Sequence, residues 1–327
     1  MAKRIAYGRA RLAFEAGSWR EARSSFAGLL AGDPAAPIFA YYLGAIAYRD
    51  GRYGEARFFF NKARDLDQND RASSGLNSTI REMAAQRRFR LADAEQGFES
   101  AARHGVPGFD LFIDPCHPRP PAYRFIARAV SRAMEECLPG LGRPDWRSFD
   151  KREATIVRSL AAGDDIIGSL ITTGYITASE FSGWGVFTES TESYFEAAFR
   201  LARQQALKSL RDPATVASSI KGVFSPKAIG SSEGKRTRDY GMLHAAVALR
   251  RLGVTAESED ILAGILAEEK CGPVAGLALV ESAVTAHFRH DPVAQKRFLD
   301  EARSADPAVV SNPLFAVLTS SGRAAGN

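Results

Sequence analysis

Two successive stretches of the chain decide the fold: KRIAYGRARLAFEAGSWREARSSFAGLLAGDPAA at 3–36 and PIFAYYLGAIAYRDGRYGEARFFFNKARDLDQND at 37–70. Aligned with a shift of 34 residues, they share nine identical positions. These are Ala6/Ala40, Tyr7/Tyr41, Ala13/Ala47, Gly17/Gly51, Glu21/Glu55, Ala22/Ala56, Arg23/Arg57, Phe26/Phe60 and Asp33/Asp67. A period of this length, with glycine, aromatic and small residues in register, indicates an array of repeated helical hairpins.

Each copy divides into two helices at a glycine. Gly17 and Gly51 follow the first helix, where a left-handed backbone costs glycine little. In the second helix, Ala22 allows the two helices to approach closely, and Phe26 fills the space between successive hairpins. This pattern resembles the tetratricopeptide repeat, and the resemblance implies a helical superhelix with a concave groove that binds a protein partner.

In such a superhelix the first helix of each hairpin lines the groove. We expect a cluster of tyrosine and arginine side chains there, the residue types that are enriched at recognition hot spots. The predicted partner-binding residues are Arg4, Tyr7 and Arg11 in the first copy, and Tyr41, Tyr48 and Arg49 in the second. A second interpretation stays open, in which Tyr7 and Tyr41 pack against another segment of the same chain. A free groove would favour an acidic peptide.

The charge distribution supports a protein partner. The chain of 327 residues has 43 Lys plus Arg and 38 Asp plus Glu, a net charge of +5. Residues 1–90 contain 16 basic and nine acidic residues, a balance of +7, so the remainder carries 27 minus 29, or −2. The sequence has neither basic residues interleaved with aromatic residues nor a recognisable nucleic-acid-binding motif. We therefore predict no nucleic-acid partner.

The cysteines indicate a reducing compartment. Cys116, Cys137 and Cys271 form no CxxC pair and are odd in number, which argues against a disulfide framework and against a zinc site. We therefore expect no metal and no cofactor, and a cytoplasmic protein. The least charged run, 166–179, is too short and too polar for a membrane span.

The segment 71–138 departs from the repeat. Its predicted order is a helix, a short strand RFRLAD at 88–93, a second helix, a strand end and a closing helix, which is typical of an α/β fold. The block FIDPCHPRPPAYRFIARAV at 112–130 resembles the last motif of SGNH (GDSL-type) hydrolases. On that resemblance His117 would be the general base, and Asp114 would orient its imidazole.

The family's other motifs are missing. The Gly-Asp-Ser-like nucleophile block, and the Gly and Asn that help to form the oxyanion hole, do not occur in this sequence. We therefore predict a non-catalytic scaffold or adaptor that binds a protein. The alternative is an SGNH-like esterase or acyltransferase in which Asp114 and His117 act with a serine from another chain, which would complete the hydrolase-like half-domain. A third interpretation is a pseudoenzyme that binds an acylated sugar or peptide without cleaving it.

The predicted fold class is mainly α: tetratricopeptide-like helical repeats with a short α/β segment like that of an SGNH hydrolase. The predicted domains are two repeats at 1–70, the hydrolase-like segment at 71–138, a linker at 139–150, a helical-hairpin repeat domain at 151–318 and a frayed tail at 319–327. Near the end, Leu299, Ala302 and Pro307 repeat the spacing of Phe26, Leu29 and Pro34. The sequence leaves open whether the aromatic-rich stretch 163–190 encloses a ligand.

Overall fold

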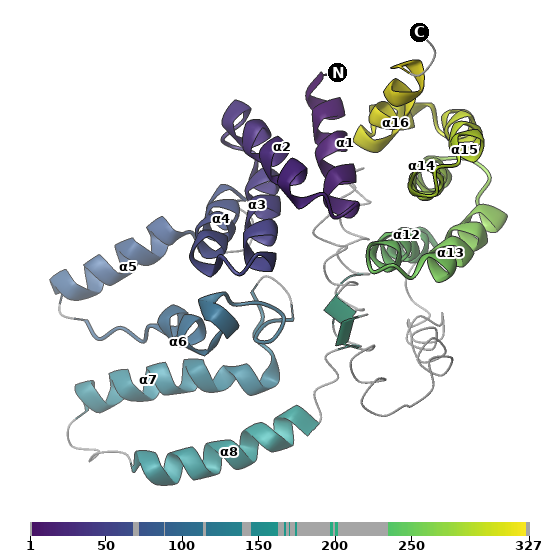
Figure 1. The fold of residues 1–327 in the computed structure, drawn as a ribbon. Coiled ribbons are helices and arrows are strands. Elements are labelled where there is room, and N and C mark those ends of the chain that lie inside the picture. The colour runs from purple at the N-terminus through teal and green to yellow at the C-terminus, as the bar shows by residue number, and fades with distance from the viewer. Residues whose placement is uncertain are drawn as a thin grey trace. The chain divides into compact units, whose positions relative to one another are not determined.

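The structure is a computed structural model, drawn in Figure 1. It describes residues 2–67, 72–87, 89–113, 116–138, 145–162 and 235–324, together with positions 167, 170, 174, 197, 198, 200 and 201. The chain divides into two compact units, which differ from the predicted domains. The first unit is Met1–Ser25 with Ile167–Asn327, and the second is Phe26–Ile166. Nearly all of the stretch 163–190 lies outside the described residues, so whether it encloses a ligand stays open.

The two predicted hairpins form as α1 (Ala2–Glu15), α2 (Trp19–Gly32), α3 (Pro37–Arg49) and α4 (Tyr53–Leu66). Gly17 and Gly51 have φ of +73° and +74°, so both glycines take the left-handed conformation predicted for the turns. Within the second unit, Phe26 stacks on Tyr42 with ring centroids 4.3 Å apart. A Cβ on Gly44 would lie 2.8 Å from the Phe60 ring, so a larger residue does not fit there.

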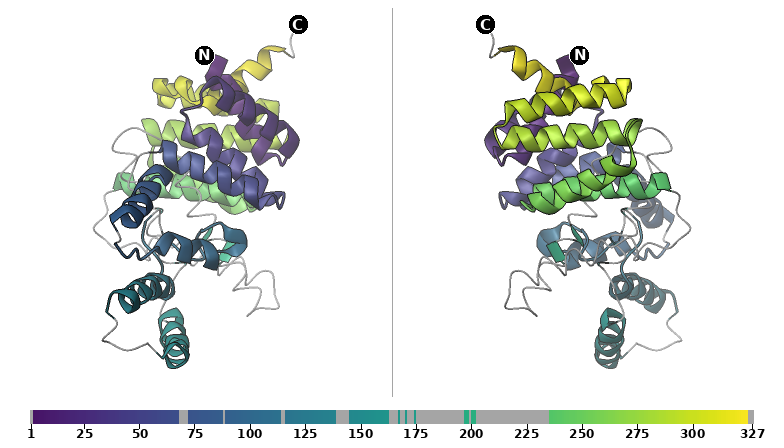
Figure 2. Two further views of the ribbon diagram at one scale, coloured as in Figure 1. Left: turned by 90° about the vertical axis from the view of Figure 1, so that its left-hand side faces the viewer. Right: turned by 90° about the vertical axis from the view of Figure 1, so that its right-hand side faces the viewer.

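The C-terminal part of the first unit repeats the hairpin geometry. Its elements are α12 (Lys235–Arg251), α13 (Thr255–Glu268), α14 (Pro273–Phe288), α15 (Pro292–Ala305), the short helix η5 (Pro307–Ser311) and α16 (Pro313–Ala324). Figure 2 shows α14 and α15 side by side. The turns use Gly253 (φ +78°) and His290 (φ +57°), and nine residues after each comes a buried leucine, Leu262 or Leu299. Phe26 and Phe60 follow Gly17 and Gly51 by the same nine residues.

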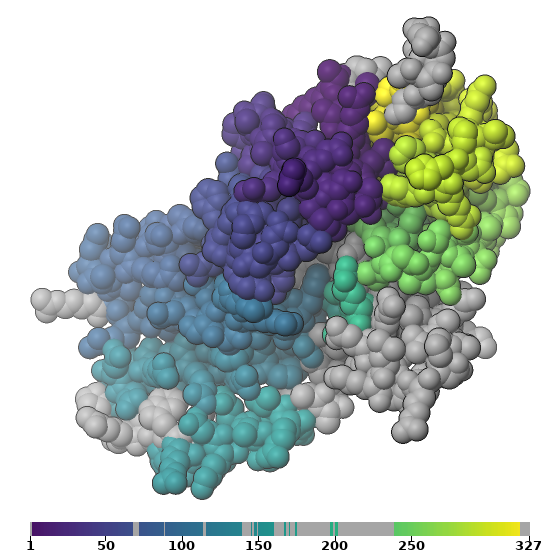
Figure 3. Space-filling view, viewed as in Figure 1, coloured from purple at the N-terminus to yellow at the C-terminus, as the bar shows by residue number. Residues whose placement is uncertain are grey.

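Helix α16 packs against α1, although the two are far apart in the sequence (Figure 1). Ile5 and Leu12 of α1 join an apolar core that includes Leu314 and Leu318 of α16. At Gly8, an added Cβ would lie 2.3 Å from the carbonyl oxygen of Pro313, so the two backbones meet closely. In Figure 3 the surfaces of the two helices adjoin.

Helix α16 continues to Ala324 and so extends into the segment 319–327 that was predicted to be frayed. Side-chain hydroxyls support this turn of the helix: Thr319 Oγ1 donates to the carbonyl oxygen of Phe315 at 2.8 Å. Ser320 Oγ donates to that of Val317 at the same distance. Residues 325–327 lie outside the described part of the chain.

The rest of the second unit is helical, which corrects the α/β prediction for 71–138. It contains α5 (Ser74–Arg87), α6 (Ala94–Ala101), η1 (Arg103–Gly105), η2 (Pro120–Ala122), α7 (Tyr123–Cys137) and α8 (Trp146–Ala162). Across the described residues of 71–138 there is no strand, and Phe112 and Pro118 form an isolated bridge. A strand at 88–93 would leave its backbone groups unpaired, because the sequence supplies no neighbouring strand.

The predicted linker at 139–150 is also shorter than expected. Helix α8 already begins at Trp146, and its first turn is supported by Asp145, whose carboxylate accepts from the backbone N–H of Ser148 at 3.1 Å. Arg128 of α7 reaches α8 through Glu153, at 2.8 Å from Nε to Oε1. Together with the core around Phe98 and Leu111, this pair holds α6, α7 and α8 together.

Candidate protein-interaction surface

The first half of the candidate surface is one face of α3. Tyr41 and Tyr48 are seven residues apart, about two turns, so they lie on the same side of the helix. Both are half-buried. The Tyr41 ring packs 5.9 Å from both Tyr42 and Phe60, measured between centroids. Its position is therefore set by the hairpin core, and its remaining exposed part is held in a fixed orientation.

Tyr48 belongs to an aromatic cluster with Tyr53 of α4 and His104 of η1. The His104 ring lies flat on Tyr53, with centroids 3.7 Å apart and an interplanar angle of 4°. Tyr48 meets Tyr53 edge-on at 5.3 Å and His104 at 6.2 Å. His104 also has a φ of +58°, which is uncommon for a residue other than glycine. A segment of the same chain, at His104, thus contacts the Tyr48 end of the α3 face.

Arg49 ends α3 and is exposed, with half of its side chain accessible. Its Nη1 lies 3.0 Å from Asp50, and Asp50 also binds Arg52 at 2.9 Å. Arg52 in turn pairs with Glu55. Hydrogen bonding to Asp50 is the largest cause of the raised pKa of Arg52, although exposure to solvent screens these pairs. An acidic ligand at Arg49 would compete with Asp50 for the guanidinium.

The second half of the candidate surface lies on α1, where two of the three predicted side chains contact other parts of the same chain or are buried. Arg4 is exposed, and its Nη1 donates to the carbonyl oxygen of Ser311 at 3.3 Å. Tyr7 is half-buried. Arg11 is only 3% exposed, so the structure corrects the expectation that it offers its charge to a partner in an open groove.

Arg11 takes part in a buried ion network centred on Glu15, whose side chain is 1% exposed. Glu15 Oε1 accepts from Arg11 at 3.2 Å and from Arg251 at 3.1 Å. Arg250 pairs with Glu15 as well, and its Nη2 lies 2.6 Å from Glu281 of α14. Burial alone would raise the pKa of Glu15, but the three guanidinium groups lower it well below its ordinary value. The network therefore ties α1 to α12 and α14 by charges that stay ionised.

This network was not among the predicted features, although the sequence carries a signal for it. Glu281 is the one acidic residue in Pro273–Phe288, a helix whose other residues are mostly apolar. Arg250 and Arg251 follow an unbroken buried run from Leu243 to Leu249. Charged residues in such runs are almost always paired when they are buried, so they indicate a partner of opposite sign elsewhere in the fold.

The six predicted residues fall into both units. Arg4, Tyr7 and Arg11 lie in the first unit, and Tyr41, Tyr48 and Arg49 in the second. The α3 face is therefore considered below on its own.

The hydrolase-like residues do not form a described catalytic site. Asp114 lies outside the described residues. His117 is exposed, its Nδ1 lies 3.4 Å from Cys116 Sγ, and its carbonyl oxygen accepts from the backbone N–H of Ile113 at 3.0 Å. The described residues on either side of Asp114 are joined by this hydrogen bond and by the bridge between Phe112 and Pro118.

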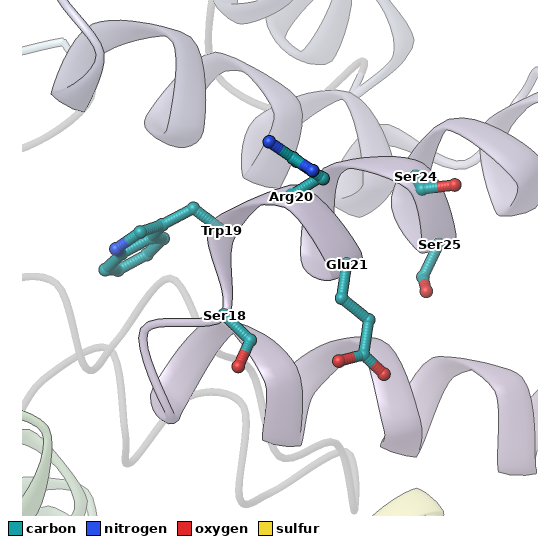
Figure 4. Close-up of a pocket in the computed structure, with 6 residues that line it drawn as sticks. All are labelled: Ser18, Trp19, Arg20, Glu21, Ser24 and Ser25. Carbon is teal, nitrogen blue, oxygen red and sulfur yellow. The ribbon is translucent and has the colours of Figure 1, made fainter.

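Small-molecule and metal sites receive little support within the part of the chain that the structure describes. No three potential metal ligands gather there. A shallow, open hollow of about 560 Å³ lies at the start of α2, lined by Ser18 to Glu21 with Ser24 and Ser25 (Figure 4). It lacks the enclosing apolar walls of a typical ligand pocket. In the same described ranges, no helix has both the length and the apolar character to cross a bilayer.

Comparison with known proteins extends the repeat assignment over part of the chain. A solved tetratricopeptide repeat domain, that of P58(IPK), is 12% identical over 99% of this chain and 98% of its own, with a TM-score of 0.24, which is too low to establish a common fold. No curated protein matches the chain. The model of the tetratricopeptide repeat family matches residues 7–71. This match spans most of α1 and all of α2 to α4 and supports the tetratricopeptide repeat that the 34-residue period predicted, and neither the family model nor the solved structure named here supports a hydrolase.

Proposed function

We propose that this protein is a non-catalytic scaffold whose second unit binds an acidic peptide segment of a partner protein on the α3 face. The observation that carries the proposal is the arrangement on α3 of two half-buried tyrosines followed by an exposed arginine, within the segment that matches the tetratricopeptide repeat. Tyrosine and arginine are enriched among residues that dominate binding energy. Tyr41 is held by core packing, so it loses little side-chain entropy on binding.

The energetic contributions divide between the two residue types. The tyrosine rings supply area that is rigid and partly apolar, while Arg49 supplies a charge-assisted hydrogen bond to a carboxylate. Because Arg49 already pairs with Asp50, the partner's carboxylate would replace one ion pair by another. The net gain in binding free energy is therefore modest. The acidic residue would therefore fix the register of the peptide, and the aromatic face would give most of the affinity.

Selection from a displayed library of short acidic peptides tests the proposal. The full chain should enrich a consensus with at least one carboxylate, and Tyr41→Ala or Tyr48→Ala should weaken binding of that consensus by about tenfold or more. Arg49→Glu should weaken it and abolish its dependence on salt. Arg57→Glu is the matched control, since Arg57 is an exposed cation on α4. Equal binding by the Arg49 and Arg57 variants, or failure to enrich any peptide, would refute the proposal.

A further inference from the structure

Helix α5 presents an apolar stripe to solvent. Leu76, Ile80 and Met83 are 52%, 44% and 51% exposed. Their spacing of four and three residues places them along one side of the helix. Arg87 continues the same line one turn later and is exposed as well. Large apolar side chains that line up on a surface, unlike single scattered ones, mark interaction sites.

A flank of α5 outside the stripe is held by the ion pairs of Arg81, which fix the helix with the stripe exposed. Arg81 binds Asp93 at 2.7 Å from Nε to Oδ2, and its Nη2 lies 2.7 Å from Glu95. Hydrogen bonding to Arg81 is the main cause of the lowered pKa of Asp93. Asp65 of α4 accepts from the backbone N–H of Ser74, at the start of α5. These contacts set the helix in place before any ligand arrives.

We propose that the α5 stripe, defined as Leu76, Ile80, Met83 and Arg87, docks an amphipathic helix of a protein partner, antiparallel to α5, with carboxylates in the partner's first turn. Side chains at i, i+4 and i+7 form a ridge that fits the groove of another helix. In the antiparallel arrangement the partner's first turn lies beside Arg87. Carboxylates there pair with Arg87 and are also favoured by the partner's own helix dipole.

A second copy of this chain fits the stripe less well. Two parallel α5 helices would bring Arg87 next to Arg87 of the other copy. Two antiparallel α5 helices would put each Arg87 beside the positive N-terminal end of the other helix, which disfavours a cation. Glu82 does not relieve either arrangement, because it lies about 120° around the helix from the middle of the stripe. A partner with acidic residues avoids both costs.

The stripe has apolar neighbours that can enlarge the contact. Phe89 and Leu91 are 65% and 38% exposed, and Arg90 between them pairs with Glu136 of α7 at 3.0 Å. On α7, Met134 lies two residues before Glu136 and is 47% exposed. The pair therefore brings the loop after α5 to the end of α7, where the residues that precede the partner helix would find further apolar side chains.

The test uses the full chain and a labelled helical peptide of about 18 residues, or five turns, with leucines at stripe spacing and glutamates in its first turn. Fluorescence anisotropy should show binding that falls about tenfold or more in Ile80→Ser with Met83→Ser. Arg87→Glu should weaken the glutamate peptide and strengthen a peptide with lysines in the same positions. Lys296→Glu, an exposed cation on α15, should change neither.

Three outcomes would overturn the proposal. Equal binding of a peptide whose leucines are replaced by serine would show that only charge attracts it. A dimer of the free chain in sedimentation, lost in the Ile80→Ser variant, would show that a second copy covers the stripe. Resistance of Met83 to peroxide, in contrast to Met134, would show that the stripe is already covered in the free chain. Arg49→Glu should leave the peptide affinity unchanged, which separates this surface from the α3 face.

Discussion

Helices α1 and α3 occupy the same place in two successive repeats, but their surroundings differ. Position 15 of α1 is a buried glutamate within an ion network, whereas the equivalent position 49 of α3 is an exposed arginine. Gly8 of α1 meets α16, whereas Tyr42 at the equivalent position of α3 stacks on Phe26 of the preceding helix. In the first unit, α16 thus takes the role that α2 plays for α3. A repeat sequence fixes the hairpin, and the residues outside its pattern decide what each helix faces.

The largest expected effect comes from removing the centre of the network. Glu15→Ala leaves three arginines buried without their shared carboxylate, so we expect the free energy of unfolding to fall by about 3–5 kcal/mol. At the equivalent position, Arg49→Ala removes an exposed pair and should cost less than about 1 kcal/mol. Urea unfolding of both variants measures the difference. Similar losses in the two variants would contradict the contrast between buried and exposed positions.

Acid should weaken the first unit through the same carboxylate. The pKa of Glu15 is lower in the folded chain than in the unfolded chain, so its contribution is complete above the unfolded value of about 4.3. That contribution is lost as the pH falls from about 5 toward the folded pKa, at up to about 1.4 kcal/mol per pH unit. Unfolding at several pH values should show the gap between the native chain and Glu15→Gln narrowing below pH of about 4. A constant gap would mean that Glu15 is not held ionised.

The close approach of α1 and α16 gives an intermediate effect. Gly8→Ala places a Cβ against the Pro313 carbonyl, and we expect a loss of about 1–3 kcal/mol in unfolding free energy. Gly28→Ala is the matched control, because a Cβ on Gly28 of α2 meets nothing within 4 Å. The control should gain up to about 1 kcal/mol from helix propensity. Equal changes in the unfolding temperature of the two variants would show that α16 moves away from position 8 at no measurable cost in stability.

The smallest effect concerns the α3 face. His104→Gly loses the ring stacked on Tyr53 but relieves the left-handed backbone, so the two changes in unfolding free energy nearly cancel, to within about 1 kcal/mol. The exposed part of Tyr48 should grow. We therefore expect the acidic consensus peptide to bind the variant more tightly than the native chain, measured by calorimetry. Weaker binding would instead make His104 part of the binding surface.

The hairpins of α1 to α4 could be predicted because their determinants are local. Gly17 and Gly51 set the turns, and Phe26 lies a fixed number of residues further on, so a 34-residue comparison reveals them. The pair Arg250–Glu15 joins residues 235 positions apart, and no local pattern connects them. Arg11 was therefore predicted as a groove cation on the strength of its helix face alone.

The strand expected at 88–93 failed for a different reason. Phe89 and Leu91 alternate with Arg90 as in a half-buried strand, but strand formation depends on a neighbour that supplies hydrogen bonds. Prediction from the sequence meets the same limit on α5. The spacing of Leu76, Ile80 and Met83 indicates an apolar face, but only the fold reveals that this face is exposed to solvent.

The contact between α1 and α16 also constrains the order of events during synthesis. Arg4 and Ser311 are 307 residues apart, so at roughly 5–20 residues per second α1 leaves the ribosome about 15–60 seconds before its neighbour exists. During that wait the α1 face must stay in water. Arg11 and Glu15, seven and eleven residues after Arg4, keep the part of this face that meets α12 hydrated until α12 is made. Charged side chains at these two positions leave less apolar surface exposed on the nascent α1 than leucines would.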